Sequence, residues 1–205
     1  RSGESKDYFA AGRVDFLAKA LRDLGVNAPT DVLDFGCGTG SAVPHLLRVF
    51  PGARICGTDV SSESLEVARS EHPESTFCPA DEIGSGLFDG AYCNGVFHHI
   101  PPVIRADALA QVHRGLKVGA WFALFENNPW NPVTVKAMRE CAFDDDAITL
   151  TPTETGRLLR SAGFAVCRTR FLFFFPRAFG IFRPLEPLLS RVPVGAQYVV
   201  LAKKA

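Results

Sequence analysis

The sequence predicts an α/β fold in which a doubly wound parallel β-sheet carries helices on both faces. Short apolar runs rich in β-branched and aromatic residues alternate with segments whose apolar residues recur at helical spacing. The chain has 205 residues, and 47% of them are apolar, which suits one domain with a parallel sheet covered on both sides. We therefore expect a single domain over residues 1–205.

The first half of the chain contains four predicted strands. A helix over residues 7–24 comes first, with apolar residues at helical spacing, and it ends at Gly25. Strands are expected at residues 30–35, 54–58, 75–78 and 88–94. Helices are expected at residues 41–50 and 61–71, and Ser61 and Ser62 are good N-cap residues for the second of these. Residues 1–28 would form a helical cap on the domain.

The second half continues the alternation and then departs from it. A helix over residues 105–116, a strand over 120–126, a helix from about Val133 and a helix over 153–162 follow in order. Residues 164–175 and 197–202 are the last two predicted strands, which we expect to close the sheet as a hairpin-like pair. The Pro-interrupted residues 176–194 form an irregular excursion between them.

Charge and cysteine content argue against several classes of function, although a local basic patch stays open. Lys and Arg together number 22, as do Asp and Glu, so the chain lacks the positive excess of a nonspecific nucleic-acid surface. The six cysteines match no zinc-binding spacing, and we expect reduced structural thiols, no metal site and a cytoplasmic location, with Cys56, Cys78 and Cys93 buried in strands. We see no membrane-spanning stretch and no secretory signal. Because the chain begins at Arg1, we expect a segment upstream of it.

The strongest local signal is the glycine-rich run of residues 32–40, V-L-D-F-G-C-G-T-G. A strand ends there, three glycines fall at alternate positions and a helix begins, so the backbone can approach a ligand closely. Ser41 occupies the place of the third glycine of the dinucleotide fingerprint G-x-G-x-x-G. Asp34 would repel a pyrophosphate but would favour a ligand with positive charge, such as an amino-acid ammonium next to a sulfonium.

Two further acids follow the next two predicted strands. Asp59 is placed to accept hydrogen bonds from a ribose diol, and an N-cap role for the following helix is the alternative. Asp81 could accept from an adenine amino group while Ile83 packs on the ring, and a solvated loop acid is the alternative. All three acids lie at the carboxyl ends of strands, where open α/β sheets bind ligands.

Five segments together resemble the motifs of class I S-adenosylmethionine-dependent methyltransferases, in a small-molecule branch of type 11 or 12. Residues 34–40 match the first motif, and residues 57–61 (G-T-D-V-S) resemble the second, whose acid holds the ribose. Residues 80–83 (A-D-E-I) resemble the third, at the adenine, and residues 88–100 (F-D-G-A-Y-C-N-G-V-F-H-H-I) the fourth. Residues 114–120 (R-G-L-K-V-G-A) are similar to an R-x-L-K-P-G-G turn, from which Val118 and Ala120 depart.

The resemblance implies a Rossmann-like, seven-stranded sheet, mostly parallel with an antiparallel last strand, and S-adenosyl-L-methionine as cofactor. The cofactor-binding residues that it implies are Asp34, Gly36, Cys37, Gly38, Gly40, Asp59, Val60, Asp81, Glu82, Ile83, Asn94 and Gly95. The backbone around Asn94 and Gly95 would face the methionine end. The N-terminal helix often lies over the cofactor in such enzymes, which makes Tyr8, Phe9 and Arg13 candidates, although a docked helix with a solvated Arg13 is the favoured alternative.

Two residues are candidates for catalysis. His98 and His99 follow the fourth predicted strand, and because adjacent side chains point in different directions we expect only His99 to face the acceptor as a general base. A histidine that is packed or caps the following turn is the alternative. Glu126 ends the fifth predicted strand and opens a loop over residues 126–132 whose amides and Trp130 could shape an acceptor pocket, and a Pro-rich turn is the alternative.

The expected function is methyl transfer to a small-molecule acceptor, and an apolar or lipid-linked acceptor is left open. We expect a monomer or homodimer with no nucleic-acid partner and no stable membrane insertion. A cofactor-binding regulatory or interaction domain without turnover is one alternative, and an NAD-dependent oxidoreductase is a second that Asp34 and the missing glycine disfavour. Residues 176–194 could form a lid, a membrane-surface contact or a subunit interface, although simple packing on the same domain is favoured.

Overall fold

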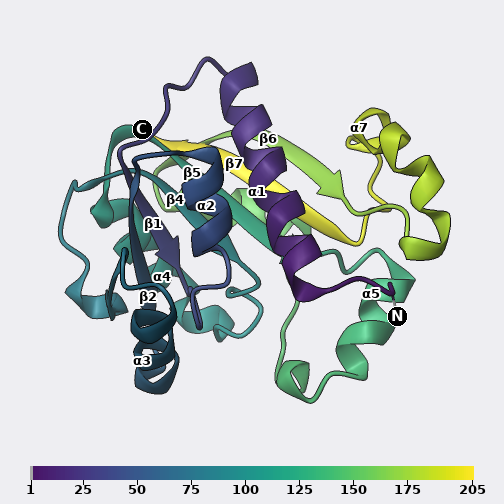
Figure 1. Ribbon diagram of the computed structural model, residues 1–205, viewed down its shortest axis with the longest axis horizontal. Helices are drawn as coiled ribbons and strands as arrows, with labels where there is room; N and C mark the ends of the chain where they lie inside the picture. The colour runs from purple at the N-terminus through teal and green to yellow at the C-terminus, as the bar shows by residue number, and fades with distance from the viewer. Residues whose placement is uncertain (1) are drawn as a thin grey trace.

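The computed structural model describes residues 2–205, and these form a seven-stranded sheet in the order β3-β2-β1-β4-β5-β7-β6 (Figure 1). The strands are β1 (Asp31–Phe35), β2 (Arg54–Asp59), β3 (Thr76–Pro79), β4 (Phe88–Asn94), β5 (Leu116–Asn127), β6 (Phe164–Leu172) and β7 (Gln197–Lys204). The pairs among β1 to β5 are parallel, and β7 is antiparallel to both β5 and β6. The predicted doubly wound α/β sheet with an antiparallel last strand is confirmed.

Helices cover both faces of this sheet, as the alternation of side chains along the strands requires. One face packs against α1 (Lys6–Asp23), α2 (Val43–Val49) and α3 (Ser62–Glu71), and the other against α4 (Arg105–Gly115) and α6 (Pro152–Ser161). Figure 1 shows α1 and α2 in front of the sheet. Within β1, Val32 belongs to the first buried cluster whereas Leu33 and Phe35 belong to the second. β1 therefore contributes to the cores on both faces of the sheet.

Polar side chains fix where several helices begin. The Ser61 hydroxyl accepts a hydrogen bond from the Ser64 amide at the start of α3, which confirms its predicted capping role. Thr151 and Glu154 form a capping box at the start of α6. Asn131 accepts hydrogen bonds from two amides at the start of α5 (Pro132–Arg139), which follows β5. These caps use orphan amides that a helix start would otherwise leave unpaired.

Some predicted bounds were wrong. β6 ends at Leu172 rather than residue 175, because Phe173 has a φ of 61° and its ring turns back towards Gly12 of α1. α2 begins at Val43 rather than residue 41, because the chain first makes a turn in which the Val43 amide donates to the Gly40 carbonyl. β5 begins at Leu116, before a register shift opposite β4, so it is longer than predicted.

The structure bears on two expectations from the sequence, the state of the cysteines and the presence of a membrane-spanning helix. All six cysteines are free, but only Cys93 of the three placed in strands is buried, whereas Cys56 and Cys78 are half-buried. Within residues 2–205, no helix has both the length and the apolar character that crossing a bilayer needs.

The excursion over residues 176–194 contains a 3-10 segment, η4 (Arg177–Leu185), and the short helix α7 (Glu186–Leu189). Its base packs on the domain: Arg183 donates to Glu4 at 2.6 Å, and its guanidinium lies 4.6 Å from the centre of the Tyr8 ring. Ile181 and Leu188 remain 84% and 79% exposed. Packing on the same domain is therefore observed at the base, while the lid, membrane and interface hypotheses for the exposed side chains stay predictions.

Two glycine substitutions test the packing of the sheet and of α6. A Cβ on Gly90 of β4 would lie 1.9 Å from the Trp121 ring, so Gly90→Ala should destabilise the fold by about 1–3 kcal/mol through overpacking. A Cβ on Gly156 of α6 would meet only the flexible Arg160 side chain, at 3.5 Å, so Gly156→Ala should stabilise by about 0.5–1 kcal/mol. Urea unfolding measures both, and equal effects of the two variants would contradict this description of the core.

Candidate active site

The glycine turn after β1 is held against β2 and leaves an open cradle. The amides of Gly36 and Cys37 both donate to the Thr58 carbonyl, at 2.7 and 2.9 Å. Gly36, Gly38 and Gly40 have φ values of 72°, 54° and 81°, a region in which glycine carries no steric penalty. A Cβ on Gly38 would meet no atom within 4 Å, so the space over this residue is open to a ligand.

Asp34 lies at the base of this turn with one carboxylate oxygen unsatisfied. Its side chain is 2% exposed, and its Oδ2 has no hydrogen-bond partner among residues 2–205. Burial raises the pKa of Asp34 to about 7, the charge of Asp59 adds to the rise, and the Arg13 guanidinium opposes it. A buried carboxylate without a partner is costly. A cationic ligand group at Oδ2 would remove that cost, as the sequence-based interpretation of Asp34 requires.

Asp59 joins the turn to the end of β2. Its Oδ2 accepts from the Gly38 amide at 2.8 Å, and its Oδ1 accepts from the Ser61 amide at 3.0 Å. The alternative in which Asp59 is the N-cap of α3 is wrong, because the Ser61 hydroxyl does that work. Beside it, the Val60 side chain is 96% exposed and therefore free to pack on a ligand.

Asn94, at the end of β4, supplies a second unsatisfied oxygen on the same face as Asp34. Its Oδ1 is buried and has no partner in the described part of the chain. Asp34 is paired in register with Tyr92, and Asn94 lies two residues further along β4, so both side chains point to the face that α1 covers. The next residue, Gly95, has a φ of 67°. The two orphan oxygens thus lie at the carboxyl ends of neighbouring strands.

Two predicted cofactor contacts are corrected. Ile83 is only 5% exposed and packs in the core against Gly115 and Phe88, so its predicted packing on an adenine ring is wrong. Cys37 is 7% exposed, its thiol faces Gly57, and burial raises its pKa, so only its backbone can serve the turn. Asp81 and Glu82 are exposed in the 3-10 turn η1 (Ala80–Glu82) after β3.

The three side chains of the N-terminal helix that we considered as cofactor contacts all contact other parts of the protein. Arg13 is 7% exposed rather than solvated, because it donates to the Tyr92 hydroxyl at 3.0 Å and to Gln197 at 3.1 Å. Tyr8 and Phe9 pack against the Phe173 ring, with centroids 6.1 and 4.9 Å apart. These two rings therefore pack against the segment just before the excursion, and Arg183 of the excursion lies over Tyr8.

The two histidines after β4 differ in burial. The side chain of His98 is 3% exposed and its Nδ1 lies 2.5 Å from Glu126 Oε2, whereas His99 is 24% exposed. Burial lowers the pKa of His98, but its hydrogen bond to Glu126 and the charges of Glu126 and Asp144 outweigh burial and raise it. His99 is thus the member of the pair that a ligand can reach.

The Glu126 side chain is not exposed to solvent. Its side chain is 1% exposed, and its Oε1 accepts from the Phe97 amide at 2.8 Å while its Oε2 holds His98. This burial contradicts the prediction that Glu126 acts directly on an acceptor, because both carboxylate oxygens face the protein interior. The loop after it follows the Pro-rich turn alternative in part, because Asn128 accepts from the Trp130 amide.

Sequence reasoning missed two acids that cover the histidines. Asp144 Oδ1 lies 3.5 Å from His98 Nε2 and 3.6 Å from His99 Nε2, and Asp146 Oδ1 lies 3.4 Å from His99 Nδ1. Both belong to the segment between α5 and α6. The run of three aspartates at residues 144–146 was a visible signal, but the sequence does not show over which strand end such a segment folds.

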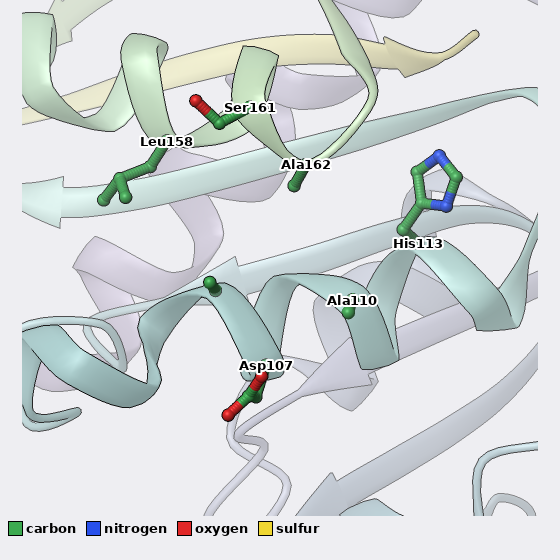
Figure 2. Close-up of a pocket in the computed structure, with 7 residues that line it drawn as sticks. Asp107, Ala110, His113, Leu158, Ser161 and Ala162 are labelled. Carbon is green, nitrogen blue, oxygen red and sulfur yellow. The ribbon is translucent and has the colours of Figure 1, made fainter.

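Two surface hollows lie away from this site. One, of about 380 Å³, lies between α4 and α6. Figure 2 shows its lining, with Ala110 and His113 opposite Leu158 and Ala162. Burial and the charge of Lys204 lower the pKa of His113 there. The second, of about 770 Å³, lies between α1, β6 and the excursion. Neither includes the glycine turn.

Comparisons with known proteins identify the family. A methyltransferase domain model of type 12 matches residues 33–122, from β1 into β5. An uncharacterized methyltransferase of Synechocystis sp. strain PCC 6803 is 30% identical over 167 residues, which cover 77% of both chains. This chain belongs to the class I S-adenosylmethionine-dependent methyltransferases. The methyltransferase therefore has S-adenosyl-L-methionine as its cofactor, and the oxidoreductase and non-catalytic alternatives fall away.

Other similar proteins match this methyltransferase over only part of their length or at lower sequence identity. A trans-aconitate 2-methyltransferase of Azoarcus sp. strain BH72 is 30% identical over 133 residues, but the match covers 62% of this chain and 52% of that relative. The chain thus spans about half the length of that enzyme. A SAM-dependent methyltransferase structure from Archaeoglobus fulgidus superposes with a TM-score of 0.68, covering 93% of this chain and 94% of that one at 16% identity, which concerns the fold alone.

Because Asp34 is buried, we expect a trade-off between folding stability and cofactor binding at this residue. Its pKa is raised above the ordinary 3.8 of the unfolded chain to about 7, so the folded state holds the proton more tightly and stability falls as pH rises between these values. At pH 8, Asp34→Asn should therefore raise the free energy of unfolding by at most about 4 kcal/mol and the melting temperature by several degrees. At pH 4 the change in both should be smaller.

The same Asp34→Asn variant should bind S-adenosylhomocysteine more weakly, because the neutral amide no longer attracts an ammonium. Melting curves at both pH values and calorimetric titration measure the two effects. A variant that loses stability equally at both pH values would show that Asp34 is satisfied in the folded protein.

Proposed function

We propose that this methyltransferase methylates a small molecule that carries an apolar portion and is bound at the carboxyl ends of β4 and β5, beside His99. The observation that carries the proposal is the pair of buried oxygens, Asp34 Oδ2 and Asn94 Oδ1, that have no partner in residues 2–205. They suit a cationic amino-acid end of the cofactor at the end of β4, next to the histidines. The reacting methyl group would then lie at the same edge.

The described residues fit the remaining parts of the cofactor. In our proposal Asp59 holds the ribose, and Val60, Asp81 and Glu82 border the adenine. The backbone of the turn, including Gly36, Cys37, Gly38 and Gly40, and the backbone at Gly95 approach the methionine portion. The open space over Gly38 and the 96% exposure of Val60 support this placement.

The cofactor supplies a methyl group already activated by its sulfonium, so the protein contributes mainly orientation and exclusion of water. Asp34 and Asn94 bind and orient the amino-acid end. Glu126 positions His98, which lies against the Gly95 backbone, because a Cβ on Gly95 would be 3.5 Å from His98 Cε1. His99 remains our candidate for action on the acceptor, because it is the more exposed of the two histidines.

The surroundings of His99 support an acceptor with an apolar portion. Phe143 packs edge-on against the His99 ring, with centroids 5.0 Å apart, yet is 79% exposed. Ile148, whose amide donates to the His98 carbonyl at 2.7 Å, is 50% exposed. Small-molecule sites are lined mostly by apolar and aromatic side chains with a few polar groups, and Phe143 and Ile148 would supply the apolar part beside His99. Lipid-linked acceptors remain within this class.

We also propose that the enzyme works in the cytoplasm as one domain, alone or as a homodimer, without nucleic acid as substrate. The six free cysteines support a reducing compartment. The zero formal net charge supports a substrate other than nucleic acid.

A transfer assay tests the acceptor class. Protein and tritium-labelled S-adenosylmethionine are incubated with a panel of phenols, fatty acids, isoprenoid acids, polar amines and compact polycarboxylates, and with RNA and protein in parallel. We expect label in small molecules that carry both an oxygen nucleophile and an apolar group. Transfer confined to RNA, to protein or to wholly polar molecules would refute the proposed acceptor class.

Substitution of Asp59 tests the proposed cofactor orientation. Asp59→Ala removes the proposed ribose acceptor and the bond to the Gly38 amide, so the affinity for S-adenosylhomocysteine should fall at least about a hundredfold. Asp107→Ala on α4, outside the site, is the matched control. Calorimetric titration gives both dissociation constants, and unchanged affinity of the Asp59 variant would show that the ribose assignment is wrong.

A further inference from the structure

We propose that His98, His99 and Asp144 form a binding site for one divalent transition-metal ion at the acceptor side of this methyltransferase. The three side chains come from two segments, the turn after β4 and the segment between α5 and α6. One potential ligand atom from each lies within 4.8 Å of the others. We expected no metal site because the cysteine spacing matches no zinc pattern, but the three ligands proposed here include no cysteine.

Two of the three distances between the potential ligand atoms match those between ligands of one ion, and the third is within 4.8 Å. His98 Nε2 and His99 Nε2 lie 3.5 and 3.6 Å from the same oxygen, Asp144 Oδ1. Nitrogen and carboxylate ligands lie about 2.0–2.2 Å from Zn²⁺, so two ligands of a tetrahedral ion are about 3.4 Å apart. Both nitrogen–oxygen distances are longer than a good hydrogen bond and close to this edge length. An ion would need only small movements of these side chains.

The opposite nitrogen of each histidine faces a second carboxylate, which lies close to His98 and farther from His99. His98 Nδ1 lies 2.5 Å from Glu126 Oε2, and His99 Nδ1 lies 3.4 Å from Asp146 Oδ1. Histidines that bind metals nearly always donate their other ring N–H to a carboxylate, a carbonyl or water, which fixes the tautomer. Donation from both Nδ1 atoms would leave the two Nε2 atoms, 3.5 and 3.6 Å from Asp144 Oδ1, free to bind a cation.

The local charge also favours a cation. Glu126, Asp144 and Asp146 surround the two imidazoles. Arg105, whose pKa the charge of Glu126 raises while burial lowers it, already donates to the carbonyls of Ile100 and Ile148, at 2.8 and 2.6 Å. The cluster therefore has more negative than positive charge when the histidines are neutral. A divalent ion would compensate that excess.

The ligand types select the class of ion. Two imidazoles and one carboxylate suit Zn²⁺, Fe²⁺ or Co²⁺ better than Ca²⁺, Mg²⁺ or Mn²⁺, which prefer oxygen ligands. Three protein ligands leave at least one coordination position for a substrate oxygen. The partial exposure of His99 and Asp144, 24% and 14%, gives a route from solvent.

The role of the ion rests on the proposed function and makes it more specific. A cation beside Gly95 would hold the acceptor oxygen near the methyl group and lower its pKa. The hydroxyl proton of the acceptor passes to solvent, the oxygen forms the new bond to the methyl carbon, and the electron pair of the breaking carbon–sulfur bond stays on sulfur. His99 is then a metal ligand rather than a general base, and the acceptor is an oxygen nucleophile.

Cobalt binding tests the site without acceptor or cofactor. Chelator-treated protein is titrated with Co²⁺, and binding is followed by calorimetry and by the visible absorption of the low-symmetry ion. We expect one ion per chain. Asp144→Asn and His99→Gln should each weaken binding at least about tenfold. Asp145→Asn removes the same charge from the adjacent exposed residue and should bind as the wild type does.

Several results would overturn the proposal. These are the absence of saturable Co²⁺ and Zn²⁺ binding, wild-type affinity in both site variants, or an equal loss in the Asp145 control. Circular dichroism and melting curves check that each variant is folded, and the two site variants are independent of each other. Affinity for S-adenosylhomocysteine is measured on the same samples: its retention without metal binding overturns the metal site alone, whereas its loss in the wild type contradicts the proposed function.

Discussion

The burial of Asp34 at the end of β1, with one oxygen unpaired, is the constraint on which the site depends. The strands on either side fix its position, β2 through the glycine turn and β4 through the register with Tyr92. Nearby Asp59 adds a second negative charge and raises the Asp34 pKa further. Such a pair of acids is unfavourable in the free protein. The unfavourable energy becomes binding energy when a cationic group reaches Oδ2.

The proposed cofactor-binding and acceptor-binding residues lie at one edge of the sheet but on its opposite faces. Asp34 and Asn94 point to the face that α1 and α2 cover, whereas Glu126 follows Phe122 and Leu124 on the face of α4 and α6. They meet because parallel strands end together and β4 passes from Asn94 directly into the turn that carries the histidines. Alternation along β4 and β5 thus separates cofactor binding from acceptor binding within a short distance.

The sequence predicts this fold well because its signals are local. Alternating apolar runs, the glycine turn and the cap at Ser61 act over a few residues, and the strands and helices they predict are present. Predictions failed where a tertiary contact decides the end of a strand or the direction of a side chain. Phe173 ends β6 early because its ring turns back towards Gly12, and Ile83 turns into the core beside Gly115. Asp144 was missed because only the folded chain brings it over His98 and His99.

The number of protons released when S-adenosylhomocysteine binds tests the central claim most directly. Calorimetry at pH 6 in buffers of different ionisation enthalpy counts these protons. With a pKa of about 7, Asp34 is mostly protonated in the free enzyme at this pH and should ionise against the cofactor ammonium. The wild type should then release about one proton more than Asp34→Asn. Equal proton release by the two proteins would contradict the role of Asp34 as the partner of the cationic end.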